Sequence, residues 1–313
     1  MRSAFVESSF LPFLSSAQNE DGGWGFHAGA MSRAEPTAWA LIALLECAST
    51  PAHEEAASRA VRFLLAAQLP DGSWASTPES REGCWATSLV CLALHGRNDS
   101  SASAMRGLDW LSKELPGDAS LFQRLLRRLR LKKSISNQNP LYFGWSWTAG
   151  TASWVEPTSC AILSFRAAPA QSLSADAQRR LRMGETMLYD RMCPSGGWNS
   201  GNLIVYGGAG EPLVSPTVWA LLALQEHPER PEVHKSIQWL ESNWQSILGH
   251  GSLALALLAL HAYGRPGAGL AGPLQARYES NETPWSVPEV AWAALALSGA
   301  QDWWKPKSNG KDR

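Results

Sequence analysis

The feature that most constrains the fold of this chain is an internal repeat. The segment Phe13-Leu14-x3-Gln18-x5-Trp24 recurs with identical spacing as Phe63-Leu64-x3-Gln68-x5-Trp74. More degenerate copies begin at Arg106-Gly107-x2-Trp110-Leu111, at Met187-Leu188-x3-Met192-x5-Trp198 and at Trp239-Leu240-x3-Trp244, and a weak sixth runs from Leu274 to Trp285. Self-similarity of this kind is typical of repeat architectures, in which one unit cannot bury its apolar face without its neighbours.

Each copy is followed by a stretch that is apolar almost all round. These six stretches are 35–46, 84–96, 156–165, 215–226, 251–263 and 288–299. A helix without a polar face must be buried, whereas the preceding stretches, such as 53–67 and 174–191, mix charged and apolar residues at helical spacing and can face water. Six such pairs bury their apolar helices by closing into an inner ring within an outer ring. The sequence therefore predicts an all-α (α/α)6 barrel over residues 1–304, with a frayed polar tail at 305–313.

Proline marks the start of several inner helices and fixes their direction. Pro36, Pro157, Pro216 and Pro288 each stand at a first helical turn, where the missing N–H is no loss. Because every inner helix follows an outer one, all six begin at the same end of the barrel, which we call the mouth. Their partial positive charges add there, so the mouth is also a natural site for anions.

Composition excludes several classes of protein. The 27 Lys+Arg residues balance 28 Asp+Glu residues, so no overall field attracts nucleic acid. The five cysteines contain no Cys-x-x-Cys pair, which disfavours a disulfide framework and fits a reducing cytoplasm. Acidic residues interrupt the N-terminal segment, unlike a signal peptide, and the longest apolar run, 253–263, is about half the length of a membrane-spanning helix. We expect a cytoplasmic protein.

The repeats resemble the Gln-Trp motif of squalene-hopene and oxidosqualene cyclases, in which a basic residue, a glycine, an aromatic and an aliphatic residue precede Gln-x5-Trp. The third copy carries the head of this pattern and the first two carry its tail. The resemblance implies membership of the terpene cyclase and protein prenyltransferase superfamily, an isoprenoid ligand and a central apolar cavity. It also implies a bracing role, rather than a catalytic one, for Gln18, Gln68, Trp24, Trp74 and Trp198.

The chain departs from that family in two respects. It has no Asp-x-Asp-Asp motif, the acid with which the class II cyclases protonate an alkene. It also supplies one barrel, as a prenyltransferase β subunit does, where triterpene cyclases use two, so a second barrel subunit is a candidate partner. Glu82 and Cys84 match the zinc ligands of the prenyltransferases only in part. His250 falls on an inner helix that does not neighbour the inner helix next to Glu82 and Cys84. We therefore expect no metal and no cofactor.

Three acids are candidates for catalysis because they lie at inner-helix starts. An alkene is a very weak base, so the acid must be held neutral in a dry cavity, beside a second hydrogen-bonding group. Glu35 begins the first inner helix and Glu289 the sixth, and ring closure makes these helices neighbours, so the two could form an acid pair. Glu156 begins the third inner helix. The alternative is that these carboxylates only complement helix dipoles, as Ser215 at the equivalent fourth position suggests.

Five further residues are candidates for ligand binding. Trp145, Trp147 and Trp154 form an aromatic group near Glu156, and aromatic faces stabilise carbocations. His27 and Arg33 lie in the first loop at the mouth and could contact a diphosphate. The alternatives are packing for the tryptophans and solvation for the loop residues.

An insertion at about 116–141 interrupts the repeat. Its segment 121–133 contains six cations, clustered from Arg124 to Lys133, no acids, and apolar residues at helical spacing. This pattern predicts a basic amphipathic helix, which could hold the protein at the inner face of a membrane. A surface helix that packs its leucines on the barrel is an equal alternative.

We expect the barrel to bind an isoprenoid in its cavity, and its candidate activities are cyclisation, as an isomerase, and transfer, as a transferase. One alternative is a non-catalytic barrel that binds a lipid, a peptide or a partner protein. A second is a carbohydrate-active (α/α)6 enzyme with paired carboxylates. Fold analogy alone does not decide among them.

Overall fold

Helices make up nearly all the secondary structure of the described part of the chain. The computed structural model describes residues 3–47, 50–95, 101–119, 139, 141–201, 204–205, 208–247, 249–267, 269–280, 282–300 and 303. Within these residues the only strands are β1 (Ile204–Val205) and β2 (Gly208–Ala209), which pair antiparallel. The predicted all-α class is therefore confirmed.

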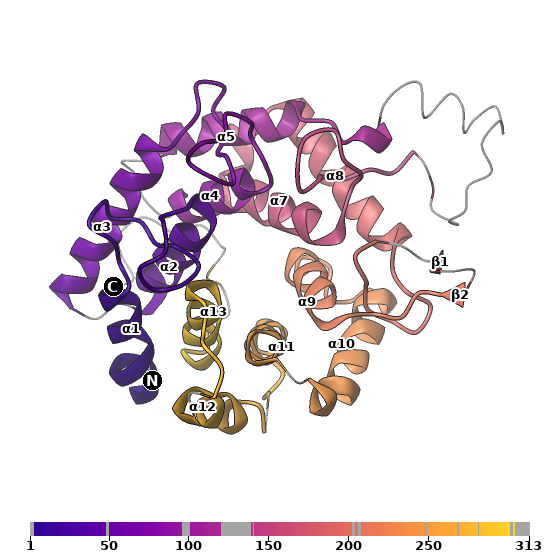
Figure 1. Cartoon of the computed structure of the whole chain (residues 1–313). Helices are drawn as coiled ribbons and strands as arrows, with labels where there is room; N and C mark the ends of the chain where they lie inside the picture. Colours follow the sequence, from indigo (N-terminus) through magenta and orange to yellow (C-terminus); the bar gives the residue numbers. More distant parts are fainter. Residues whose placement is uncertain are drawn as a thin grey trace.

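The six apolar stretches form an inner ring of helices. They are α2 (Ala34–Cys47), α4 (Ala86–Leu94), α7 (Val155–Ala167), α9 (Val214–Ala223), α11 (His250–Ala262) and α13 (Val287–Leu297). Each packs against the next in this order, and α13 packs against α2, so the ring is closed (Figure 1). Because they are shielded on all sides, these helices are buried almost from end to end, as their lack of a polar face predicts.

The outer helices are amphipathic and bury one face each. They are α1 (Leu11–Ser16), which continues a π-helical turn at Val6–Phe10, α3 (Pro51–Ala66), α5 (Ser101–Lys113), α8 (Ala175–Asp190), α10 (Pro231–Asn243) and α12 (Ala271–Ser280). Side-chain caps begin two of them, since Thr50 accepts from the N–H of His53 and Ser174 accepts from that of Ala177. Short 3₁₀ turns lie at Gly117–Ala119, Ala170–Ser172 and Trp244–Ser246.

The repeat tryptophans tie each outer helix to the inner helix that follows it. Trp24 Nε1 donates to the carbonyl oxygen of Leu14 at 2.8 Å, and its main-chain N–H donates to Thr37 Oγ1 at 2.9 Å. Trp74 makes the same two bonds to Leu64 and Thr87. Trp198 bonds in the same way to Leu188 and Thr217. These side chains are fully buried, so their bracing role is structural.

The repeat glutamines tie one hairpin to the next. Gln18 Nε2 donates to the carbonyl oxygens of Gly22 and Ala56, both at 2.9 Å, and so joins its own turn to α3. Gln68 bonds equivalently to Gly72 and Ser103, which joins the second turn to α5. A polar side chain that satisfies two buried carbonyl groups at once fixes the angle between successive hairpins.

Two predicted segments, the basic stretch 121–133 and the tail 305–313, lie outside the described residues. In the described part, no helix combines the length and the apolarity that crossing a membrane requires.

Candidate functional site

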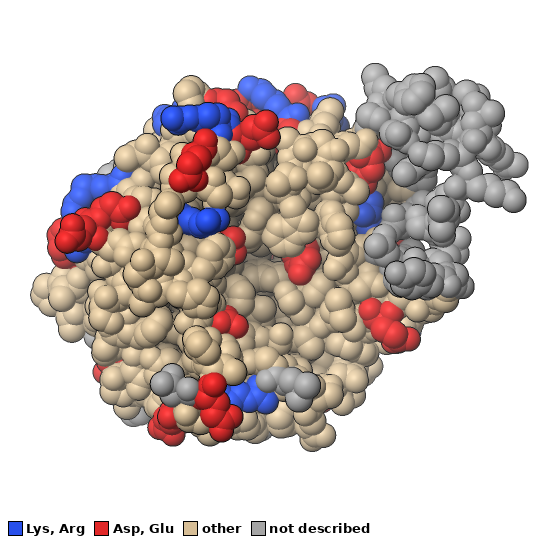
Figure 2. Space-filling model, in the orientation of Figure 1, with Lys and Arg blue, Asp and Glu red and all other residues tan. Residues whose placement is uncertain are grey.

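Three inner helices carry pairs of residues at equivalent positions near the mouth of the ring. Glu35 and Trp39 on α2, Glu156 and Cys160 on α7, and Ser215 and Trp219 on α9 are each four residues apart, so the members of each pair lie on one face of their helix. The first residue of each pair belongs to the first turn at the mouth and the second lies one turn deeper. Figure 2 shows the surface hollowed at the centre of this face, with acidic side chains inside the hollow.

Glu35 is the acid most perturbed by its surroundings at this hollow. Burial raises the pKa of its carboxyl group from 4.5 to about 7, and the positive charge of Arg33 only partly opposes this. Near neutral pH the group is thus divided between the acid and the carboxylate, which is a property of a general acid.

Glu156 faces the same space from α7. Burial raises the pKa of its carboxyl group as well, and a hydrogen bond from Ser215 Oγ to Oε1, at 3.4 Å, acts in the opposite direction. The thiol of Cys160 is fully buried, and both Glu156 and Glu35 raise its pKa further. Since α2 and α7 are not neighbours in the ring, an effect of both carboxylates on one thiol means that both face the interior.

A cluster of tryptophans fills the barrel below these acids. Trp39 and Trp219 belong to helices on opposite sides of the ring, yet their ring centroids are 5.3 Å apart. Trp292 of α13 and Trp303 also contact Trp39, at 5.7 and 5.8 Å between centroids. The hollow therefore has an indole floor, which we call the tryptophan floor and define by these four residues. The cavity expected at the barrel centre is occupied by side chains at this level.

The contacts of Glu289 stabilise the start of its own helix. Its Oε2 accepts from the main-chain N–H and the hydroxyl of Ser286, at 2.9 and 2.7 Å, which completes a capping box at the start of α13. The same oxygen lies 3.2 Å from Nε2 of His250, whose ring stacks on Trp285 with 4.1 Å between centroids. The carboxylate leans over Gly251 of α11. Although α13 and α2 are neighbours as expected, Glu35 is not among the contacts of Glu289.

The three candidate aromatic residues occupy different positions. Trp145 is buried like the repeat tryptophans and makes their bonds, from Nε1 to Leu111 O and from N–H to Thr158 Oγ1, both at 2.9 Å. It is therefore the bracing tryptophan of the third repeat. Trp147 is half-buried and packs edge-to-face on Trp85, 4.8 Å between centroids. Trp154 precedes α7, and its N–H donates to Trp145 O.

The two candidates in the first loop also differ in their surroundings. His27 is exposed, and no described contact of its side chain joins it to the acids. Arg33 is half-buried and close enough to Glu35 to affect its pKa. Among the described residues, no group of three or more His, Cys, Asp and Glu side chains is arranged to hold a metal ion. Glu82, Cys84 and His250 are accordingly not brought together.

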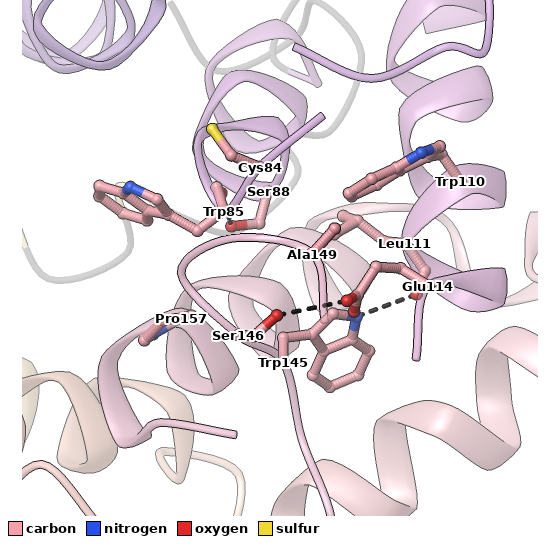
Figure 3. Close-up of a pocket in the computed structure, with 10 residues that line it drawn as sticks. All are labelled: Cys84, Trp85, Ser88, Trp110, Leu111, Glu114, Trp145, Ser146, Ala149 and Pro157. Carbon is pink, nitrogen blue, oxygen red and sulfur yellow. Dashed lines mark hydrogen bonds between the residues drawn. The ribbon is translucent and has the colours of Figure 1, made fainter. Parts of the chain in front are cut away.

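Glu114 was not singled out from the sequence, yet its carboxyl group lines a pocket. The pocket lies beside the mouth, between α4, α5 and the loop after Trp145, and its walls include Trp85, Trp110 and Ser146 (Figure 3). Glu114 Oε1 accepts from Ser146 Oγ at 3.3 Å, and Oε2 is buried without a partner. Burial raises the pKa of this group, with the charge of Arg180 opposing.

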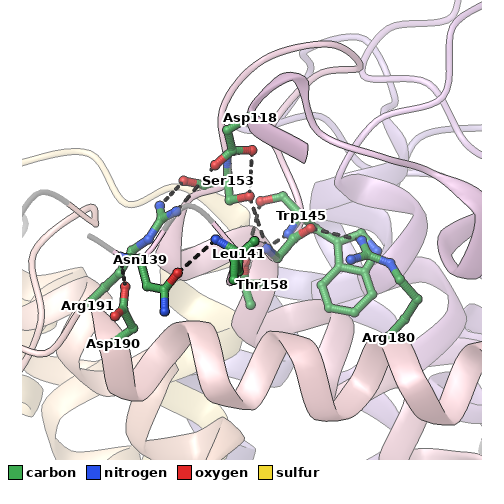
Figure 4. A network of polar contacts seen from close by, with 10 residues as sticks. Asp118, Asn139, Leu141, Trp145, Ser153, Thr158, Arg180, Asp190 and Arg191 are labelled. Carbon is green, nitrogen blue, oxygen red and sulfur yellow. Dashed lines mark hydrogen bonds and ion pairs between the residues drawn. The ribbon is translucent and has the colours of Figure 1, made fainter. Parts of the chain in front are cut away.

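An ion-pair network holds the loop that forms this pocket. Arg191 Nη1 donates to Ser153 O at 2.8 Å, and Nη2 lies 3.3 Å from Asp118 Oδ2 (Figure 4). The other oxygen of Asp118 accepts from the hydroxyl of Ser153 at 2.9 Å, and that hydroxyl in turn accepts from the N–H of Gly144 at 3.0 Å. These contacts fix the loop on both sides of Trp145.

Comparison with known proteins agrees with this geometry. Residues 1–84 match the family described as squalene-hopene cyclase C-terminal domain. A segment of 67 residues is 45% identical to drimenyl diphosphate synthase of Streptantibioticus cattleyicolor, and a segment of 88 residues is 38% identical to lanosterol synthase of Aspergillus fumigatus. These matches show that the first 84 residues of the chain are similar to the squalene-hopene cyclases. The two matches cover 21% and 25% of the chain but only 12% and 11% of these relatives, far less than their full length.

Solved structures show the same fold over nearly the whole chain. The type II terpene cyclase MstE from Scytonema superposes with a TM-score of 0.62 at 14% identity, over 95% of this chain and 98% of that one. Variants of MstE have been solved with geranylgeranyl dihydroxybenzoate as substrate and with merosterolic acid A as product. Alpha-2-macroglobulin of Escherichia coli also matches, with a TM-score of 0.50 at 15% identity, over 94% of this chain and 42% of that one. At these identities the likeness shows the fold alone. The match to alpha-2-macroglobulin, which is not named as a cyclase, illustrates that this fold does not by itself define a function.

Proposed function

We propose that this barrel binds an isoprenoid in the hollow at its mouth and protonates it there, with Glu35 as the acid. The observation that carries the proposal is the position of two desolvated carboxyl groups, Glu35 and Glu156, one turn above the tryptophan floor. Burial keeps a fraction of Glu35 protonated near neutral pH, so a proton is available to an apolar ligand.

The tryptophan floor supports the same chemistry. A cation formed by protonation of an alkene would lie against Trp39 and Trp219, whose π faces attract positive charge. Glu156 is held by Ser215 on the adjacent helix and would offer its carboxylate to the same cation. The relation to the terpene cyclases, including a neighbour solved with a geranylgeranyl substrate, supports an isoprenoid as the apolar ligand.

Product analysis tests this proposal. The protein would be incubated with squalene and with prenyl diphosphates, with and without Mg2+ and Zn2+, and the products separated by gas chromatography and mass spectrometry. We expect cyclised product from the wild type and a loss of about 100-fold or more in Glu35→Gln, because a general acid contributes at least that factor. Glu54→Gln, at an exposed position on α3, is the matched control. Equal turnover by Glu35→Gln and the wild type would refute the role of Glu35.

One observation favours a second function, a non-catalytic barrel that binds a ligand or partner at its mouth. Because the rings of the tryptophan floor meet across the barrel axis, the hollow is shallower than a cavity running through the ring. Saturable binding of an isoprenoid without turnover under any condition would establish this second function. Absence of both binding and turnover would refute both.

We also propose that the basic segment 121–133 brings the protein to anionic membranes, because its six cations are not balanced by any acid. Sedimentation with phosphatidylserine liposomes tests this. We expect the triple variant Arg127→Glu, Arg128→Glu, Arg130→Glu to lose lipid association, and unchanged association would refute the proposal.

A further inference from the structure

The carboxyl group of Glu114 is incompletely satisfied by the protein. Its Oε1 accepts one bond from Ser146 Oγ, and its Oε2 is buried with no partner. The positive charge of Arg180 acts on this group, but Arg180 Nη2 donates to the main-chain oxygens of Glu114 and Gly144, at 3.2 and 2.9 Å, and its Nε and Nη1 are buried without a partner. A buried carboxylate oxygen without a donor is unfavourable, so a proton, a water molecule or a ligand completes this group.

The fold itself does not require an acid at this position. The carbonyl oxygens of Leu14, Leu64 and Leu111 accept the indole N–H of their repeat tryptophans, which aligns the three repeats residue by residue. Three residues after these leucines stand Ala17, Ala67 and Glu114. The first two repeats form the same turn with alanine at this position. The carboxyl group of Glu114 is therefore not needed for the bracing of the third repeat.

The pocket beside Glu114 has the chemistry of a cation site. Trp85 and Trp110 are half-buried and stand on either side of it, with the Glu114 carboxyl group and Ser146 at its base (Figure 3). Aromatic walls and a desolvated carboxylate favour a positive ligand over a neutral one, because the ring faces and the carboxylate each attract positive charge. Glu114 is the one carboxylate among the described residues that line the pocket, and metal cations such as Mg²⁺ and Ca²⁺ require several oxygen ligands, so an organic cation is the candidate.

The size of the pocket selects among organic cations. It has room for little more than one water-sized group. A primary ammonium group, –NH3⁺, is close to water in size and brings three donors, of which Glu114 Oε2 and the hydroxyl oxygens of Ser88 and Ser146 would accept. We propose that the pocket beside Glu114 is a binding site for the primary ammonium group of a small amine. A quaternary ammonium is too large to enter.

Binding would be linked to a proton. Burial favours the protonated form of Glu114, and the ammonium binds the carboxylate, so the carboxylic proton is released to solvent as the amine enters. Affinity should therefore rise as pH rises through the pKa of Glu114. This linkage separates a site built on Glu114 from weak association with the acidic surface, which is not expected to release a proton from a buried group.

Saturation-transfer NMR with methylammonium tests the proposal, because aromatic protons of the pocket would saturate the ligand methyl group directly. We expect a saturable signal from methylammonium, none from tetramethylammonium, and a loss of affinity of about tenfold or more in Glu114→Gln. Glu114→Ala restores the residue found in the first two repeats and should fold normally by circular dichroism, yet not bind. Glu79→Gln removes an exposed mouth-side charge outside the pocket and should bind as the wild type does.

Three results would overturn the proposal. They are absence of a saturable methylammonium signal from the folded wild type, equal affinity in Glu114→Gln, and equal signals from methylammonium and tetramethylammonium. None of these depends on Glu35 or on isoprenoid turnover, so this site and the proposed function can fail separately.

Discussion

Replacing Glu35 by glutamine should make the protein more stable at alkaline pH. Burial raises the pKa of Glu35 from 4.5 to about 7, so the folded state holds this proton more tightly than the unfolded chain does. Between these two pH values the folded state carries more bound protons, and the free energy of unfolding therefore falls as pH rises. Above pH 7 the whole of this penalty is present, and below 4.5 it is absent.

The size of the effect follows from the difference between the two pKa values. A difference of about 2.5 pH units corresponds to roughly 3 kcal/mol. Because Glu35 is only partly buried at the edge of the hollow, solvent screens the charge, and we expect about 2 kcal/mol at pH 8. Glutamine resembles the protonated acid in shape and charge, so Glu35→Gln should keep this stability at all pH values.

Urea denaturation followed by circular dichroism at pH 4.5, 6, 7 and 8 measures the effect. We expect the wild type and Glu35→Gln to be nearly equal at pH 4.5 and to diverge as pH rises, with the variant more stable. Glu54→Gln, which changes an exposed acid, should follow the wild type. If the pH profiles of the wild type and Glu35→Gln run parallel over this range, the carboxyl group is not desolvated and the proposed acid loses its physical basis.

Further predictions concern the repeat and the thiols. Gln68→Leu removes the donor shared by Gly72 O and Ser103 O, and should lower the free energy of unfolding by about 1–3 kcal/mol; an unchanged urea midpoint would contradict the bracing role. Gly107→Ala places a methyl group 2.3 Å from Cys91 Sγ and 2.9 Å from the Trp74 ring, so we expect a loss of about 1–3 kcal/mol, whereas Gly272→Ala on α12 meets nothing and should not destabilise. All five cysteines are buried, and burial raises the pKa of Cys84 to about 11, so Ellman's reagent should label none of them in the native protein and all five in urea. Rapid labelling of the folded protein would show that the barrel opens.

The glycine of the repeat head shows how sequence and structure explain each other. The sequence places Gly107 after a basic residue in the third copy, and the resemblance to the cyclases gives no reason for it. In the structure this glycine of α5 leaves space for Trp74 of the preceding repeat, and Gly184 of α8 does the same for Trp145, 2.7 Å from where its Cβ would be. The glycine of one repeat therefore contacts the tryptophan of the preceding repeat, and this contact joins successive hairpins.

The third repeat shows why part of the site could not be predicted. The sequence indicates Trp145 as a ligand-binding residue because it belongs to an aromatic group near Glu156. Its bracing role is hidden because the insertion separates it from its partner Leu111 by 34 residues, where the intact repeats have ten. Spacing in sequence is the only measure of equivalence before the chain is folded, so a long insertion hides a bracing tryptophan. Glu114 was missed for the same reason, since its relation to Ala17 and Ala67 appears only once the three indole bonds are aligned.

The sequence by itself determined the helical hairpins, their inner and outer assignment, the closed ring and the end at which the inner helices begin. These follow from periodicity, proline positions and the repeat, which are local properties of the chain. Only the tertiary structure decided that Glu35 and Glu156 face one interior space, that Glu289 caps its own helix, and that four tryptophans meet across the barrel. These depend on distances between residues far apart in sequence, because burial and charge act through space and determine which carboxyl groups are desolvated.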